Sequence, residues 1–140
     1  MALGTGPVAA VMGPPRRVAY TVLVVDDEPA IRDLILAVLE DEGYRAIGAG
    51  SGRRALELLA AEQPDLVLMD IMMPEMDGRE ALRRMRDGPD TADVPVVMMS
   101  AAHNPERIGH PISAFLSKPF DLDVLIETVA RVLQNAPKPQ

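Results

Sequence analysis

The chain has 140 residues, with 21 acidic and 14 basic side chains, a net charge of −7, and no cysteine or tryptophan. This length fits one domain with a substantial core, and an apolar content of 48% argues against a wholly disordered chain. Without cysteine, the chain has no disulfide, no thiolate nucleophile and no cysteine-based zinc or iron–sulfur site. The acidic balance and the scattered arginines disfavour direct binding to nucleic acid.

The sequence also indicates where the domain begins and ends. Residues 1–19 are rich in Ala, Gly and Pro and are expected to form a flexible tail, as are residues 135–140. The single domain is therefore expected over residues 20–134. No apolar run approaches the roughly 18 residues of a membrane span, and the first residues lack the basic segment of a signal peptide, so we expect a cytoplasmic protein.

Within this domain, short apolar runs alternate with helical patterns. Strands are expected at residues 21–25, 44–49, 65–69, 94–99 and 112–117. Helices are expected from Pro29 to a C-terminal cap at Gly43, from a cap at Ser51 through Leu59, from Asp77 to Asp87, and from a cap at Asp121 through Val132. This alternation predicts an α/β fold, doubly wound, with a five-stranded parallel sheet covered on both faces.

The connection between the expected fourth and fifth strands is irregular. Residues 100–111 include Pro105, Gly109 and Pro111. These residues interrupt helices, and the segment is too short for an amphipathic helix of normal length. We therefore expect a shortened or irregular fourth helix.

Polar residues follow the expected strands, where parallel sheets bind their ligands. They are Asp26, Asp27 and Glu28 after the first strand, Asp70 after the third, Ser100 after the fourth and Lys118 after the fifth. Taken singly, each has an ordinary role, such as capping a helix or ending a strand. Clustered carboxylates repel one another unless a cation neutralises them, and oxygen ligands suit magnesium or manganese. The carboxylates, the positive charge of Lys118 and the hydroxyl of Ser100 together suit phosphoryl transfer, with an aspartate as the nucleophile.

Four stretches carry a resemblance to a known family: residues 24–29 (VVDDEP), 65–78 (DLVLMDIMMPEMDG), 95–101 (PVVMMSA) and 115–120 (FLSKPF). With these motifs in this order, residues 20–134 resemble the receiver domain of two-component response regulators. The resemblance implies a flavodoxin-like sheet with strand order 2-1-3-4-5. It also implies a phosphoacceptor protein that changes its protein–protein interactions on phosphorylation.

The resemblance assigns roles to the acidic residues. Asp70 would accept a phosphoryl group from a sensor histidine kinase or a histidine phosphotransfer protein. Asp26, Asp27 and Asp70, with the backbone carbonyl of Met72, would hold Mg²⁺, for which Mn²⁺ could substitute.

It also assigns a switch. Lys118 would contact the acyl phosphate, and its peptide bond to Pro119 would be cis. Ser100 would move to bond the phosphoryl group, and the aromatic ring of Phe115 would follow. The surface near the fourth and fifth strands would then change its affinity for an unknown downstream protein.

Two features depart from the family pattern. The segment from residue 100 to residue 118 is several residues shorter than is usual in the family, and the missing part is in the fourth helix. Because that helix belongs to the family's usual output surface, this surface is in doubt here. Met72 and Ala102 occupy positions that influence phosphoryl loss in the family, and neither side chain holds water well. We therefore expect slow self-dephosphorylation.

The sequence is also compatible with other functions. A receiver-like scaffold that is never phosphorylated is one alternative. An aspartate-nucleophile phosphatase is less favoured, because such enzymes place two aspartates two residues apart after the first strand, unlike Asp26 and Asp27. We expect a stand-alone switch that is not an enzyme acting on other substrates and contacts neither DNA nor a membrane.

Overall fold

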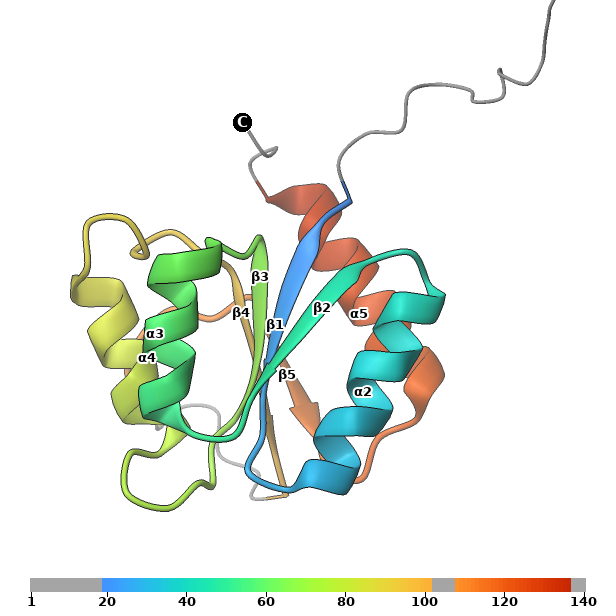
Figure 1. The fold of residues 1–140 in the computed structure, drawn as a ribbon, viewed down its shortest axis with the longest axis horizontal. Coiled ribbons are helices and arrows are strands. Elements are labelled where there is room, and N and C mark those ends of the chain that lie inside the picture. Colours follow the sequence, from blue (N-terminus) through green and yellow to red (C-terminus); the bar gives the residue numbers. More distant parts are fainter. Residues whose placement is uncertain (1–18, 102–107, 137–140) are drawn as a thin grey trace, which may run out of the picture.

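A computed structural model of the protein describes residues 19–101 and 108–136, which form five strands and four helices (Figure 1). The strands are β1 (Thr21–Val25), β2 (Arg45–Ala49), β3 (Leu66–Asp70), β4 (Val96–Ser100) and β5 (Ala114–Ser117). The helices are α2 (Pro29–Asp41), α3 (Gly52–Glu62), α4 (Gly78–Asp87) and α5 (Leu122–Asn135).

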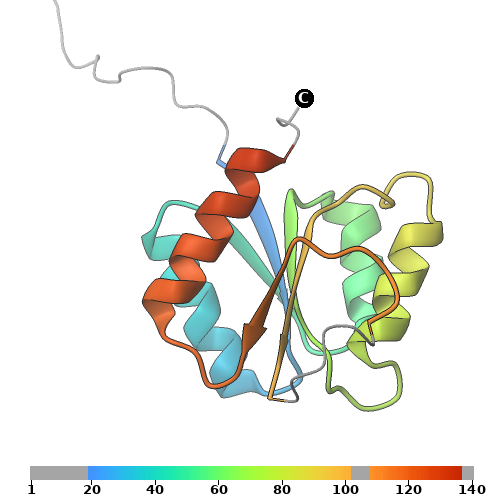
Figure 2. The same ribbon diagram turned by 180° about the vertical axis from the view of Figure 1, so that it is seen from behind.

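The five strands form one parallel sheet in the order β2-β1-β3-β4-β5. Helices α3 and α4 cover one face of this sheet, and α2 and α5 cover the other (Figures 1 and 2). The predicted fold class and strand order are therefore confirmed. In this arrangement every strand runs in the same direction, so the carboxyl ends of all five lie at one edge.

Each face of the sheet has its own apolar core. In β1, Leu23 and Val25 pack under α3 and α4, whereas Val22 and Val24 pack under α2 and α5. All five residues of β3 and of β4 are buried. This two-sided burial explains why the strands appear in the sequence as continuous apolar runs rather than alternating ones.

Side-chain caps begin two of the helices. The Ser51 hydroxyl accepts a hydrogen bond from the backbone N–H of Arg54 at 3.1 Å. Asp77 Oδ1 accepts from the N–H groups of Arg79 and Glu80 at 2.9 and 3.1 Å. These bonds satisfy N–H groups that the first helical turn leaves without partners, and the predicted cap at Ser51 is confirmed.

The ends of α2 agree with the prediction, whereas the start of α5 differs from it. Pro29 stands in the first turn of α2, and Gly43 follows this helix with a φ of 98°, a conformation that favours glycine. Asp121 precedes α5, but its side chain makes no capping hydrogen bond, contrary to prediction. Its backbone carbonyl instead accepts from the N–H groups of Val124 and Leu125 at 3.1 and 3.2 Å.

Strand β3 begins one residue later than predicted, and Asp65, just before it, bonds the start of β1 through its backbone N–H and its side chain. Its carboxylate accepts a hydrogen bond from the backbone N–H of Thr21 at 2.7 Å. Asp65 therefore holds the first residue of β1 beside the start of β3, and the strand begins at Leu66.

Strands β4 and β5 also begin two residues later than predicted. The guanidinium group of Arg86 in α4 donates to the carbonyl oxygens of Ala92 and Val94 at 2.9 and 2.8 Å. Its Nε and Nη2 atoms donate to the carbonyl of Pro111 at 3.3 and 3.0 Å. Arg86 thus holds both segments that lead into these strands, and their carbonyls bond to a side chain rather than to a neighbouring strand.

Part of the segment that connects β4 to β5 is described. Residues 101 and 108–113 contain no helix, and Ile108 is buried in the core under α3 and α4. Residues 102–107, on which much of the predicted irregular helix falls, lie outside the described residues, as do most of the two predicted tails. None of the helices in residues 19–101 and 108–136 has the length and apolar character needed to cross a bilayer.

Candidate functional site

The carboxyl edge of the sheet gathers the polar residues that the sequence places after the strands. Asp26 follows the end of β1, Asp70 ends β3, Ser100 ends β4, and Lys118 follows the end of β5. This edge is the lower one in Figure 1, where β1 turns into α2. The parallel topology therefore brings residues from four strands to one place, as expected.

Three carboxylates meet at this edge. One oxygen each from Asp26, Asp27 and Asp70 lie within 4.8 Å of one another. Asp26 is fully buried, Asp70 is 5% exposed, and Asp27 is partly exposed. Because like charges so close together disfavour ionisation, the cluster needs positive charge to balance it.

Lys118 supplies part of that charge. Its Nζ donates hydrogen bonds to Asp26 Oδ2 at 2.9 Å and to Asp70 Oδ2 at 3.2 Å. Burial alone would lower the pKa of Lys118, but the hydrogen bond to Asp26 and the charges of Asp70 and Asp26 outweigh burial and raise it. The lysine is therefore held in its charged form between the two acids.

The pKa of Asp70 is raised above its ordinary value. Burial is the largest cause, and the neighbouring charge of Asp26 acts in the same direction. The charge of Lys118 and its hydrogen bond oppose this rise without cancelling it. Asp70 is therefore an aspartate whose charged form the folded protein disfavours, chiefly because it is buried.

Backbone groups fix both buried carboxylates. Asp26 Oδ1 accepts from the N–H of Glu28 at 3.0 Å, and Asp70 Oδ1 accepts from the N–H of Met72 at 3.2 Å. The N–H of Lys118 donates to the carbonyl of Ser100 at 2.8 Å. These bonds fix Asp26, Asp70 and Lys118 relative to the backbone at the carboxyl ends of the strands.

The loop after β3 passes very close to the end of that strand. The N–H of Gly78 donates to the carbonyl of Ile71 at 2.8 Å. A Cβ atom at Gly78 would lie 2.9 Å from the Cα atom of Ile71. Glycine here lets α4 begin directly against the end of β3. In the same loop, the side chain of Met72 is exposed beside Asp70.

The two predicted switch residues lie on neighbouring strands. Ser100 is fully buried at the end of β4, opposite Ser117 of β5. Phe115 lies opposite Met98, two positions before Ser117, and packs against the core under α3 and α4. The Lys118–Pro119 peptide bond, which follows directly, is cis.

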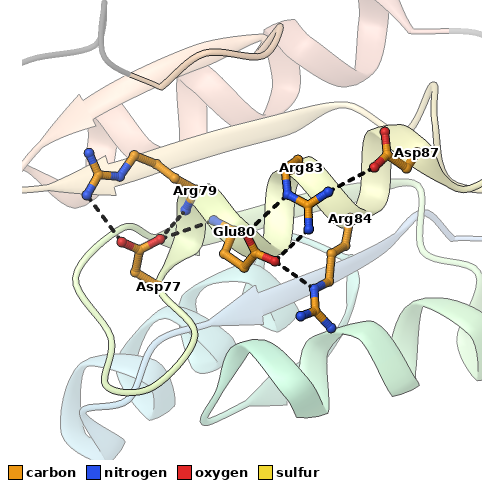
Figure 3. Close-up of polar contacts among 6 residues, drawn as sticks. All are labelled: Asp77, Arg79, Glu80, Arg83, Arg84 and Asp87. Carbon is orange, nitrogen blue, oxygen red and sulfur yellow. Dashed lines mark hydrogen bonds and ion pairs between the residues drawn. The ribbon is translucent and has the colours of Figure 1, made fainter.

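The arginine-rich run of α4 carries a ladder of ion pairs (Figure 3). Arg83 and Arg84 both bond Glu80, at 2.7 and 2.8 Å, and Arg83 also reaches Asp87 at 3.1 Å. Hydrogen bonds from the two arginines lower the pKa of Glu80 to about 2. These exposed pairs form a solvated helix face on which local acids neutralise much of the positive charge.

Arg32 is a residue near the site that the sequence reading missed. Its Nη1 atom donates a hydrogen bond to the backbone carbonyl of Asp26 at 2.8 Å. The only sequence signal is indirect, namely the small residues Gly48 and Gly50 at the end of the neighbouring strand β2, against which the arginine side chain lies.

Comparisons with known proteins match this geometry to a family. A family model described as the response regulator receiver domain matches residues 22–130. The chain is 36% identical over 116 residues to sporulation initiation phosphotransferase F of Bacillus subtilis (strain 168), covering 80% of this chain and 92% of that protein. The chemotaxis response regulator CheY4 of Vibrio cholerae is 30% identical with a TM-score of 0.75, covering 82% of this chain and 99% of that one.

A further solved structure contains a metal. The receiver domain of the sensor histidine kinase PA1611 from Pseudomonas aeruginosa PAO1, whose crystal structure has a magnesium ion coordinated in the active site cleft, is 25% identical with a TM-score of 0.77. The match covers 84% of this chain and 100% of that one.

Other relatives are longer. The chain spans between 25% and 50% of the length of several curated proteins that it matches, among them a DNA-binding transcriptional regulator from Synechocystis. Those similarities concern only the part of each relative that this chain covers.

Proposed function

Because the chain belongs to the response regulator receiver domain family, we propose that Asp70 accepts a phosphoryl group from the phosphohistidine of a sensor histidine kinase or a histidine phosphotransfer protein. The observation that supports this role most is the position of Asp70. It ends the central strand β3, and its carboxylate accepts a hydrogen bond from Lys118 within a cluster of three aspartates.

The chemistry of the donor set fits a divalent cation. Asp26, Asp27 and Asp70 offer carboxylate oxygens, and Mg²⁺ prefers such ligands. Asp26, Asp27, Asp70 and the backbone carbonyl of Met72 would hold the ion, and Mn²⁺ could replace it. When bound, the cation supplies positive charge to the oxygens of the transferring phosphoryl group.

The residues of the chain perform the remaining chemistry. A carboxylate oxygen of Asp70 attacks phosphorus, the O–P bond of an acyl phosphate forms, and the P–N bond of the phosphohistidine breaks. The departing imidazole leaves with the electron pair of that bond. The Lys118 ammonium group, already bonded to Asp70 at 3.2 Å, stabilises the negative charge of the phosphoryl group.

The switch that follows is proposed to run through β4 and β5. Phosphorylation adds ~1.5–2 negative charges at Asp70, which would draw the Ser100 hydroxyl toward the phosphoryl oxygens. The ring of Phe115 on the neighbouring strand would then repack. The resulting surface would bind a downstream protein with altered affinity, without direct contact to DNA or membrane by this domain.

Two alternatives predict different behaviour. A scaffold that never switches would keep the fold without taking up phosphate. A phosphatase would turn over an external phosphoester, but Asp26 and Asp27 are adjacent and lack the spacing expected of such enzymes. We propose that the chain catalyses reactions of its own phosphoaspartate only.

The first experiment measures phosphoryl uptake by intact mass. The protein is incubated with acetyl phosphate, or with phosphoramidate, which carries a P–N bond, with and without Mg²⁺. We expect magnesium-dependent addition of one phosphoryl group, and none in Asp70→Asn. Asp90→Asn, at an exposed position away from the site, is the matched control and should behave like the wild type.

Three results would contradict the proposal: no uptake from either donor, uptake that persists in Asp70→Asn, or catalytic release of phosphate from p-nitrophenyl phosphate. The last result would favour the phosphatase. Absence of uptake together with no binding of beryllium fluoride, which mimics the phosphoryl group, would favour the scaffold.

A further inference from the structure

Arg32 joins the first turn of α2 to the end of β1. Its Nη1 atom donates to the backbone carbonyl of Asp26 at 2.8 Å, and its side chain is partly buried. An arginine so close to an acidic cluster would ordinarily pair with a carboxylate. Here the structure shows it bonded to the peptide of Asp26 instead, which suggests a role in shaping the backbone.

Strand β2 leaves space for this side chain. A Cβ atom at Gly48 would lie 3.2 Å from Cδ of Arg32, and one at Gly50 would lie 3.1 Å from its Nη1 atom. A Cβ atom at Gly50 would therefore require the guanidinium group to shift by a few tenths of an ångström. Because Gly48 and Gly50 have no side chains, the Arg32 side chain can lie beside them and reach the carbonyl of Asp26.

The carbonyl, the N–H group and both carboxylate oxygens of Asp26 all make hydrogen bonds, and the bond from Arg32 is one of these. The N–H of Asp26 donates to the carbonyl of Ala49 at 3.1 Å. Its carboxylate accepts from the N–H of Glu28 at 3.0 Å and from Lys118 at 2.9 Å. The carbonyl bonded by Arg32 belongs to the peptide that leads to Asp27, so this bond fixes the direction in which the chain enters Asp27.

We propose that Arg32 is a positioning residue for the divalent cation: by holding the Asp26 carbonyl, it orients the Asp27 carboxylate toward Asp26 and Asp70. This inference rests on the proposed function, because it concerns the same metal site. Partners of this kind, which hold a ligand without touching the metal, typically change metal affinity roughly 10–100-fold when removed.

A purely electrostatic role predicts the opposite sign. Removing a positive charge near the cluster would make the site more negative and would strengthen the binding of a cation. The positioning role predicts weaker binding, because Asp27 would lose its fixed direction. The sign of the change in magnesium affinity therefore separates the two roles.

The test is a calorimetric titration with Mg²⁺, since the chain has no tryptophan to report binding by fluorescence. We expect Arg32→Met, which keeps an apolar stem without donors, to raise the dissociation constant of Mg²⁺ roughly tenfold or more. The matched control is Arg131→Met, which removes the same charge from an exposed position on α5 and should leave that constant within about twofold. An unchanged or lower constant in Arg32→Met overturns the inference.

A second variant moves the guanidinium group without removing its charge. Gly50→Ala should weaken magnesium binding in the wild-type background, because its Cβ atom would crowd Arg32 Nη1. In the Arg32→Met background the same substitution should have no further effect on affinity. An equal loss in both backgrounds would mean that Gly50 acts independently of Arg32, and would overturn the inference.

Failure of this inference differs from failure of the proposed function. Wild-type protein that binds no Mg²⁺ would contradict the metal site itself, and both proposals with it. Wild-type binding with undiminished affinity in Arg32→Met contradicts the positioning role alone. Urea unfolding of each variant, performed without metal, verifies that the protein titrated is folded, and at saturating Mg²⁺ phosphoryl uptake on Asp70 should recover in Arg32→Met.

Discussion

Gly78 approaches the carbonyl oxygen of Asp70 so closely that a Cβ atom at this glycine would lie only 2.5 Å from it. The neighbour is backbone at the end of a buried central strand, so neither partner moves easily. The first residue of α4 and the last residue of β3 are therefore placed by the same contact. Glycine is required here by space, because its φ is not in the left-handed region.

Gly78→Ala should destabilise the fold by about 1–3 kcal/mol, the typical effect of forcing an extra carbon into a packed region. Because Asp70 would be displaced, phosphoryl uptake from acetyl phosphate should also slow. Urea unfolding and intact mass measure the two effects. A variant with wild-type stability would show that the loop relaxes freely, and would contradict the steric requirement for glycine at position 78.

Asp70→Asn should make the fold more stable near neutral pH. The pKa of Asp70 is raised in the folded state, chiefly by burial, so the folded protein favours the protonated form and ionisation opposes folding. The stability associated with Asp70 is thus full below its ordinary pKa of 3.8 and is lost as the pH rises through the raised value. The asparagine variant, which cannot ionise, avoids that loss.

Urea unfolding at several pH values tests this sign, with EDTA present because a bound cation would stabilise the folded wild type. The advantage of Asp70→Asn should be largest near pH 7 and should shrink toward pH 3.8, where the wild-type carboxyl becomes protonated. An asparagine variant less stable than the wild type at pH 7 would mean that the bond from Lys118 outweighs burial.

Arg86→Met should lower the free energy of unfolding by about 2–3 kcal/mol. The guanidinium group donates to three carbonyls that precede β4 and β5. One hydrogen bond to a charged group typically contributes about 1.5–3 kcal/mol. Because Arg86 is partly exposed and water can replace some of its bonds, we expect a loss no larger than that of one such bond. Arg86→Lys should rescue little, because an ammonium group lacks the planar fork of donors.

The matched control is Arg83→Met on the same helix, where the arginine makes only exposed ion pairs. Such pairs contribute about 0–1 kcal/mol. Equal losses in the two variants, measured by urea unfolding, would contradict a special role for Arg86.

Met72→Asn should shorten the lifetime of the phosphorylated protein. Met72, two residues after Asp70, is 62% exposed, and its thioether is a weak acceptor that holds water poorly. An amide at this position could hold a water molecule for attack on phosphorus. The measurement is decay of the phosphorylated mass after donor removal, and equal decay in the two proteins would contradict the expectation of slow self-dephosphorylation.

The sequence predicts the fold and the gathering of the acids well, because both depend on short-range patterns. Buried parallel strands appear as continuous apolar runs, and the residues after them must share one edge of the sheet. Asp26, Asp70 and Lys118 could be placed together for that reason. Their roles in phosphoryl transfer stay predictions until the mass measurement.

Contacts made by long side chains could not be predicted in the same way. Arg32 and Arg86 look like ordinary helix-surface residues in the sequence, yet their guanidinium groups reach backbone carbonyls in other segments. Asp65 was assigned to a strand, but its carboxylate bonds the first residue of β1. Such contacts depend on how elements pack, which residue spacing alone does not encode. The contacts of Arg86 also account for the later starts of β4 and β5.

The bond from Lys118 to Asp26 spans 92 positions of sequence, and the bond from Lys118 to Asp70 spans 48. No local fragment of the chain can assemble this site. A chain emerging from the ribosome would carry Asp70 as an ordinary aspartate until β5 has been made and joins the edge of the sheet. A donor would then find an acceptor bonded to Lys118 only on chains that already include β5, so that shorter nascent chains could not compete for the phosphoryl group.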